Sequence, residues 1–154
     1  MIHHISIPAQ NPRLVAKVLG QLLQGKVYPF FPAEGSYIAV QFDDNGTAIE
    51  VYPLNTQILP ADGHPQFVRT VFSPSNCAFH AAISVGLSQT EIERIALEQG
   101  WRVQLCNRGP FSVIELWLEN RLLIELLTPE LAQRYLEFTR PEKVAAFFSS
   151  VASA

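Results

Sequence analysis

The sequence predicts an α+β protein in which two tandem βαβββ modules form a curved mixed sheet, followed by helices at the C-terminus. Short segments in which apolar and polar residues alternate indicate half-buried strands. Each half of the chain also has one segment with apolar residues at helical spacing, which indicates an amphipathic helix. The halves repeat the same order at nearly the same spacing: His4 precedes Glu50 by 46 residues, and His80 precedes Glu125 by 45. Repetition over this length predicts two modules related by a pseudo-two-fold axis.

The first module is expected to cover residues 1–53. Residues 2–9 alternate as a strand does, and Asn11 followed by Pro12 is a typical start of a helix. This helix is expected to end at Gly25, because glycine commonly follows the last turn of a helix. Three further strands are expected at 26–31, 37–42 and 47–52, the last two joined by a hairpin turn at 43–46.

The second module, residues 78–129, repeats this order. A strand is expected at 78–85, and Ser88 with Glu91 forms a capping box for a helix that ends at Gly100. The remaining strands of the module are expected at 101–106, 112–118 and 122–127.

Residues 54–77 are expected to form a linker between the modules. This stretch should lack regular structure, because it contains four residues that interrupt helices and strands: Pro60, Gly63, Pro65 and Pro74. Residues 130–154 are expected to form a helical tail, with helices at 130–137 and 141–152. A chain of 154 residues is typical of one compact unit, so residues 1–154 are interpreted as a single domain.

Composition excludes several classes of function. Hydrophobic residues make up 48% and charged residues 16%, which is enough apolar material for a packed core. The net charge is −3 and no basic run occurs, so nucleic-acid binding is not expected. Neither a membrane-spanning stretch nor a signal-peptide pattern is present, so we expect a cytoplasmic protein. Cys77 and Cys106 have no metal-binding spacing and are interpreted as reduced thiols.

Strand alternation places four potential metal ligands on strand faces that are turned away from the helices. If the apolar positions of each strand face the helix, then the opposite face carries one histidine and one glutamate per module: His4, Glu50, His80 and Glu125. Two imidazoles and two carboxylates suit a divalent ion such as Zn, Ni, Co, Mn or Fe. The alternative is that these are unconnected polar residues in a cavity or an interface.

Four segments carry a resemblance to a known family. They are HHISI at 3–7, TAIEVYP at 47–53, FHAAISV at 79–85 and LLIELLTP at 122–129. In this order they resemble the vicinal oxygen chelate superfamily, which includes glyoxalase I, bleomycin-resistance proteins and extradiol dioxygenases. The resemblance implies a divalent metal held by His4, Glu50, His80 and Glu125. It also implies a lyase, isomerase or epimerase reaction on a small-molecule substrate bound through vicinal oxygens. By analogy with glyoxalase I, Glu125 is the expected general base, and Glu50 is the other candidate.

Five more residues are candidates for binding that substrate. Four lie on strands near the predicted cavity, and the fifth lies in a loop beside Gly109, where it could meet an anionic group: Gln41, Tyr52, Gln104, Trp117 and Arg108. The alternatives are that the four line the core and that Arg108 is a solvated loop arginine. We expect a homodimer. A metal-free protein that sequesters a small molecule, as bleomycin-resistance proteins do, is the alternative function. A third is an interaction protein whose C-terminal helices carry the function.

Overall fold

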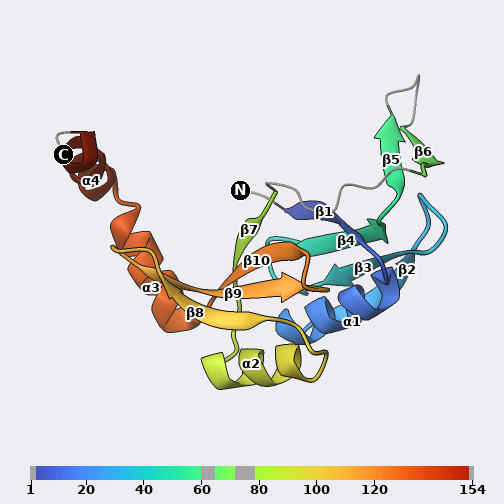
Figure 1. Cartoon of the computed structure of the whole chain (residues 1–154), viewed down its shortest axis with the longest axis horizontal. Coiled ribbons are helices and arrows are strands. Elements are labelled where there is room, and N and C mark those ends of the chain that lie inside the picture. The colour runs from blue at the N-terminus through green and yellow to red at the C-terminus, as the bar shows by residue number, and fades with distance from the viewer. Residues whose placement is uncertain (1–2, 60–64, 72–78, 153–154) are drawn as a thin grey trace. The chain divides into compact units, whose positions relative to one another are not determined.

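The computed structural model describes residues 3–59, 65–71 and 79–152, and the chain divides into two compact units (Figure 1). Unit 1 comprises Met1–Ala78 together with Leu118–Leu122, and unit 2 comprises Phe79–Trp117 together with Leu123–Ala154. The division after residue 78 lies within one residue of the predicted start of the second module. No helix in the described ranges has the length and apolar character needed to cross a membrane.

Unit 1 contains the first βαβββ module. Its elements are β1 (His4–Ala9), α1 (Pro12–Leu22), β2 (Lys26–Phe30), β3 (Ser36–Val40) and β4 (Ala48–Pro53). The four strands form one sheet in the order β1-β4-β3-β2, in which β1 is parallel to β4 and the other neighbours are antiparallel. The predicted order of elements is therefore confirmed, with strand ends shifted by one or two residues.

The helix α1 packs its apolar stripe on this sheet. The side-chain oxygen of Asn11 accepts the backbone N–H of Leu14 at 3.1 Å, and Pro12 occupies the first turn, as predicted. The helix and the strands below it supply fully buried side chains: Val15, Ala16, Val18, Leu19, Leu22, Ile7, Ile49 and Val51. Burying one such aliphatic side chain contributes roughly 1.5–3 kcal/mol, so this packing holds the sheet and the helix together.

A glutamate distant in sequence completes the start of α1. The carboxylate of Glu119 accepts the backbone N–H groups of Gln10 and Asn11, each at 2.7 Å. Glu119 lies in the tight turn that belongs to unit 1, although the strands on either side of it are in the second module. A carboxylate beside the first N–H groups of a helix also interacts favourably with the helix dipole.

The end of α1 differs from the expectation. The residue with the left-handed backbone is Gln24, with φ of 51°, rather than Gly25. Gly25 is needed for another reason: a Cβ at this position would lie 2.0 Å from the carbonyl oxygen of Val40 and 2.8 Å from its carbon. The glycine therefore allows the chain after α1 to lie against the end of β3.

Replacing Gly25 with alanine is expected to destabilise the protein by about 2–3 kcal/mol, because the added methyl meets backbone that cannot rotate away. Gly100→Ala is the matched control: no described atom lies within 4 Å of the added Cβ, and φ is +67°. That control should lose only about 1 kcal/mol through backbone strain. Urea unfolding of both variants measures the difference, and equal losses would contradict the steric explanation.

Unit 2 contains the second module and the tail. Its elements are β7 (Ala81–Ser84), α2 (Gln89–Leu97), β8 (Val103–Asn107), β9 (Ser112–Leu118), β10 (Leu122–Leu127), α3 (Pro129–Phe138) and α4 (Pro141–Ala152). The sheet order is β7-β10-β9-β8, with β7 parallel to β10, which reproduces the first sheet strand for strand. The predicted capping box of Ser88 and Glu91 is present.

Two expectations about local structure are wrong. The strand predicted at 78–85 begins only at Ala81, so Phe79 and His80 precede it, and Phe79 is 43% exposed. The predicted linker contains a hairpin of β5 (Thr56–Leu59) and β6 (Gln66–Arg69). Pro65 does not interrupt this hairpin, because it lies just before β6. The other linker breakers (Pro60, Gly63 and Pro74) lie outside the described residues, as does Cys77.

Candidate metal centre

Unit 1 brings one predicted histidine and one predicted glutamate together. His4 begins β1, Glu50 lies in the middle of β4, and these strands are parallel neighbours in which Ser6 pairs with Glu50. The imidazole Nε2 of His4 lies 3.9 Å from Oε1 of Glu50. The side chain of His4 is 60% exposed, whereas that of Glu50 is 14% exposed, so the imidazole lies in solvent and the carboxylate is largely covered.

The other oxygen of Glu50 is held by two hydroxyl groups. Ser6 Oγ donates to Oε2 of Glu50 at 2.7 Å, and the Tyr52 hydroxyl donates to the same oxygen at 3.2 Å. Tyr52 is itself held by aromatic neighbours: its ring stacks on Phe67 at 5.4 Å and meets Phe30 edge-on at 6.0 Å. Burial raises the pKa of Tyr52, and the charge of Glu50 raises it further, so Tyr52 stays a neutral donor. Oε1 is therefore the oxygen that faces His4.

The geometry of the His4–Glu50 pair is close to that of two ligands of one ion. An ion with bonds of about 2.1 Å holds neighbouring ligand atoms about 3.0–3.4 Å apart, so the two side chains would need to approach by roughly 0.5–0.9 Å. In the described part of unit 1, no Lys or Arg forms an ion pair with Glu50. A half-buried carboxylate without a fixed cation is a favourable place for a metal ion.

Unit 2 repeats this arrangement of strands. Glu125 lies in the middle of β10 and pairs in register with Ala82 of β7. His80 therefore precedes the residue opposite Glu125 by two positions, as His4 precedes Ser6. His80 is exposed and lies just before the first residue of β7. The similar sequence spacing in the two halves thus corresponds to the same register offset between a histidine and a glutamate in both units.

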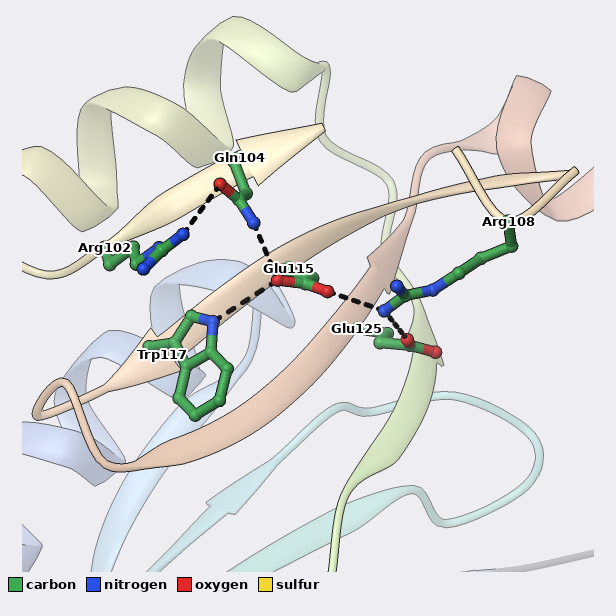
Figure 2. Close-up of polar contacts among 6 residues, drawn as sticks. All are labelled: Arg102, Gln104, Arg108, Glu115, Trp117 and Glu125. Carbon is green, nitrogen blue, oxygen red and sulfur yellow. Dashed lines mark hydrogen bonds and ion pairs between the residues drawn. The ribbon is translucent and has the colours of Figure 1, made fainter. Parts of the chain in front are cut away.

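Glu125 differs from Glu50 because an arginine contacts it. Nη2 of Arg108 donates to Oε1 of Glu125 at 2.7 Å and to Oε1 of Glu115 at 2.6 Å (Figure 2). Glu115 lies on β9, the neighbour of β10, and only 11% of its side chain is exposed. Without a cation, two carboxylates on adjacent strands would repel each other. The guanidinium therefore offsets part of the negative charge of these two carboxylates.

The predicted substrate residues of unit 2 lie around Glu115. Gln104 Nε2 donates to Oε2 of Glu115 at 2.9 Å, the indole N–H of Trp117 donates to the same oxygen at 3.4 Å, and Arg102 donates to Gln104 at 3.2 Å (Figure 2). Burial raises the pKa of Glu115, but the hydrogen bonds from Gln104, Arg108 and Trp117 outweigh it and lower that pKa overall. The pKa of Arg108 is raised, first by its hydrogen bond to Glu125.

Sequence reasoning missed Glu115. A signal was present, because a single acidic residue stands in the otherwise apolar segment IELWL of β9. Gln41, another predicted substrate residue, directly follows β3. It lies at the same end of the sheet as His4, because Val40 and His4 both pair with Ala48. Its backbone N–H donates to the carbonyl of Thr47 at 2.9 Å.

Neither unit by itself holds a complete set of metal ligands. In the described part of either unit, no three His, Cys, Asp or Glu side chains gather in a group that could bind an ion. Each unit instead offers one histidine and one glutamate at the same strand offset.

The thiol of Cys106 is expected to react slowly with alkylating reagents. Burial raises the pKa of Cys106, and the nearby charge of Glu115 raises it further, so less of the reactive thiolate forms at neutral pH. Iodoacetamide labelling followed by mass spectrometry of the Cys106 peptide measures the rate. The same peptide in urea-unfolded protein should label faster, and equal rates would contradict this explanation.

Two tandem βαβββ modules, each with its own four-stranded mixed sheet, make up the fold that this chain shares with glyoxalase/bleomycin-resistance proteins of known structure. No protein-family model and no curated protein matches the sequence. Among solved structures, the chain is similar to the fosfomycin resistance protein FosX from Listeria monocytogenes complexed with Mn(II) and sulfate. They share 12% identity over 90% of this chain and 97% of that chain, with a TM-score of 0.57.

Two further structures show the same fold. FosX from Mesorhizobium loti shares 10% identity over 88% of this chain and 96% of that chain, with a TM-score of 0.54. A glyoxylase/bleomycin resistance protein/dioxygenase domain from Frankia sp. EAN1pec shares 11% identity over 83% of this chain and 96% of that chain, with a TM-score of 0.51. The predicted fold class is therefore confirmed.

Proposed function

We propose that this chain is a metal-dependent protein that binds a small molecule through vicinal oxygens and acts as a lyase, isomerase or epimerase. The observation that carries the proposal is the register offset between histidine and glutamate, which is the same in both units: His4 begins β1, His80 lies just before β7, and each stands two positions before the residue that pairs with the glutamate on the neighbouring parallel strand. Unrelated polar residues have no reason to occur twice at the same register. Listeria FosX, whose structures contain Mn(II), in one case together with 1S,2S-dihydroxypropylphosphonic acid, supports a divalent ion and a small oxygen-rich ligand.

Four residues are the proposed ligands of the ion. His4 and Glu50 of unit 1 and His80 and Glu125 of unit 2 would hold the ion, whether one chain supplies both pairs or two chains of a homodimer exchange them. When bound, such an ion acts as a Lewis acid toward substrate oxygens. Ser6 and Tyr52 hold one oxygen of Glu50, so the other, which faces His4, would be available to bind the ion.

The glutamates are the proposed groups for proton transfer. A general base must reach the proton that it removes with a suitably placed oxygen. Glu125 is the proposed base, and Glu50 is the other candidate. Gln104, Trp117 and Arg108 each donate a hydrogen bond to Glu115, and their side chains would contact the substrate.

A metal-free binding protein is the second candidate, and one observation favours it. Arg108 already supplies Glu125 with a positive charge, so this carboxylate is stabilised without any ion. Such a protein would sequester a small molecule and transform nothing.

Metal binding by the wild-type protein separates the two candidates. The protein should be purified without a metal-affinity tag, stripped with EDTA, and titrated calorimetrically with Mn²⁺, Zn²⁺, Ni²⁺, Co²⁺ and Fe²⁺. The metal-dependent proposal predicts one ion per chain with at least one of these metals. Binding of none of them would overturn it and leave the metal-free alternative.

A further inference from the structure

The two proposed metal carboxylates have different electrostatic partners. Glu50 receives hydrogen bonds from the neutral hydroxyls of Ser6 and Tyr52. Glu125 receives its hydrogen bond from the guanidinium of Arg108 at 2.7 Å. Because each carboxylate occupies the same register position in its unit, this contrast is the clearest departure from the internal symmetry.

Arg108 reaches Glu125 from a loop, not from a strand. It follows β8, where its backbone N–H donates to the carbonyl of Phe111 at 2.8 Å, and Gly109 after it has φ of 90°. The side chain extends from this loop to the space between Glu115 and Glu125 (Figure 2). Its exposed fraction is 37%, so the guanidinium can swing on its flexible stem while the backbone stays in place.

The contact with Glu125 is not of the strongest kind. Both carboxylates are bound through the same nitrogen, Nη2, whereas the strongest arginine–carboxylate pairs use two parallel N–H···O bonds. If Arg108 leaves Glu125, its contact with Glu115 can remain. Glu115 is fixed in turn by Gln104 and Trp117. The guanidinium therefore has a second position close by, and leaving Glu125 does not require full transfer to water.

The guanidinium of Arg108 occupies Oε1 of Glu125, and its positive charge repels any second cation that approaches the same carboxylate. We propose that Arg108 is a resident cation at Glu125 that competes with a divalent ion for this carboxylate, so that Arg108 sets the metal affinity of the site. This inference rests on the proposed function. It adds that Arg108 acts on the ion through Glu125 and is a positioning residue, not a ligand.

Arg108→Gln is expected to lower the dissociation constant of the preferred divalent ion about tenfold or more, because the ion no longer competes with a charged hydrogen bond. Arg108→Lys keeps the charge on a shorter reach and should fall between Arg108→Gln and the wild type. Calorimetric titration with Mn²⁺ or Zn²⁺ measures each constant. The metal should also raise the melting temperature of Arg108→Gln more than that of the wild type, because the ion there replaces a missing cation.

Arg102→Gln is the matched control. Arg102 belongs to the same network and carries the same charge, and it donates to Gln104, which in turn donates to Glu115. Its removal should leave the metal affinity within about threefold of the wild type, since an exposed charge is screened by solvent.

The outcomes separate the inference from the function on which it rests. If the wild type binds an ion and Arg108→Gln and Arg108→Lys bind it no more tightly, the competition by Arg108 is refuted while the metal proposal stands. If Arg102→Gln tightens binding as much as Arg108→Gln, the effect is one of general charge and the inference is again refuted. If neither the wild type nor either Arg108 variant binds a divalent ion, both proposals fail.

Discussion

Replacing Glu50 with glutamine is expected to lower the metal affinity of the protein more than any other single change in unit 1. The amide keeps the shape of the side chain, and Ser6 and Tyr52 can still donate to its oxygen, so the fold should persist. The negative charge that attracts the ion is lost. Loss of a supporting partner around a metal site costs about 10–100-fold in affinity, and loss of a charged ligand should exceed that. Calorimetric titration of the stripped protein measures the loss.

Two variants with smaller expected effects on metal affinity test the same role of Glu50. Tyr52→Phe and Ser6→Ala each remove one hydroxyl that holds Oε2 of Glu50, so each should weaken binding by about tenfold, as outer partners of metal ligands do. Glu98→Gln is the charge-matched control, because Glu98 pairs with the exposed Arg94 on α2. Unchanged binding in Glu50→Gln, or an equal loss in Glu98→Gln, would contradict the role assigned to Glu50.

Removing either histidine is expected to weaken metal binding strongly and by similar amounts. His4 and His80 stand at the same offset from Glu50 and Glu125, so His4→Ala and His80→Ala remove equivalent ligands. Each should lower the affinity by about 100-fold or more, beyond the effect of an outer partner. Both side chains are exposed, so little stability should be lost. Titration with Co²⁺, followed by its visible absorption, reports both the affinity and changes in the coordination of the ion.

His3→Ala is the control for the histidine variants. His3 is adjacent to His4, but its ring contacts the backbone carbonyl of Asn45. Its removal should leave the cobalt spectrum unchanged. A large loss in His4→Ala with none in His80→Ala would show that the internal repeat does not extend to the metal site.

The repeated framework is readable from the sequence because it depends on local patterns. Alternation in β4 and β10 placed Ile49 and Ile124 on the buried face, and both are buried. The same alternation put Glu50 and Glu125 on the opposite face of their strands. Sequence patterns alone therefore predicted the order of elements in both modules and the strand on which each glutamate lies, but they placed His80 inside a strand that begins one residue later.

Features that depend on tertiary contact were not predictable in this way. Gly25 is required by the approach of Val40, and Glu119 binds the start of α1 from more than 100 residues away. The hairpin of β5 and β6 arises in a segment whose prolines suggested irregular structure. Likewise, no periodicity indicates that a loop arginine reaches Glu115 and Glu125, because a long side chain can point in many directions.

The most direct test of the central claim is a crystal structure of the protein loaded with its preferred divalent ion, with data collected on both sides of the absorption edge of the metal. The account predicts one anomalous peak per chain, with His4, Glu50, His80 and Glu125 each at about 2.0–2.2 Å from it. A peak bound by other residues, or Glu50 and Glu125 with no ion in common in a fully loaded crystal, would contradict the account.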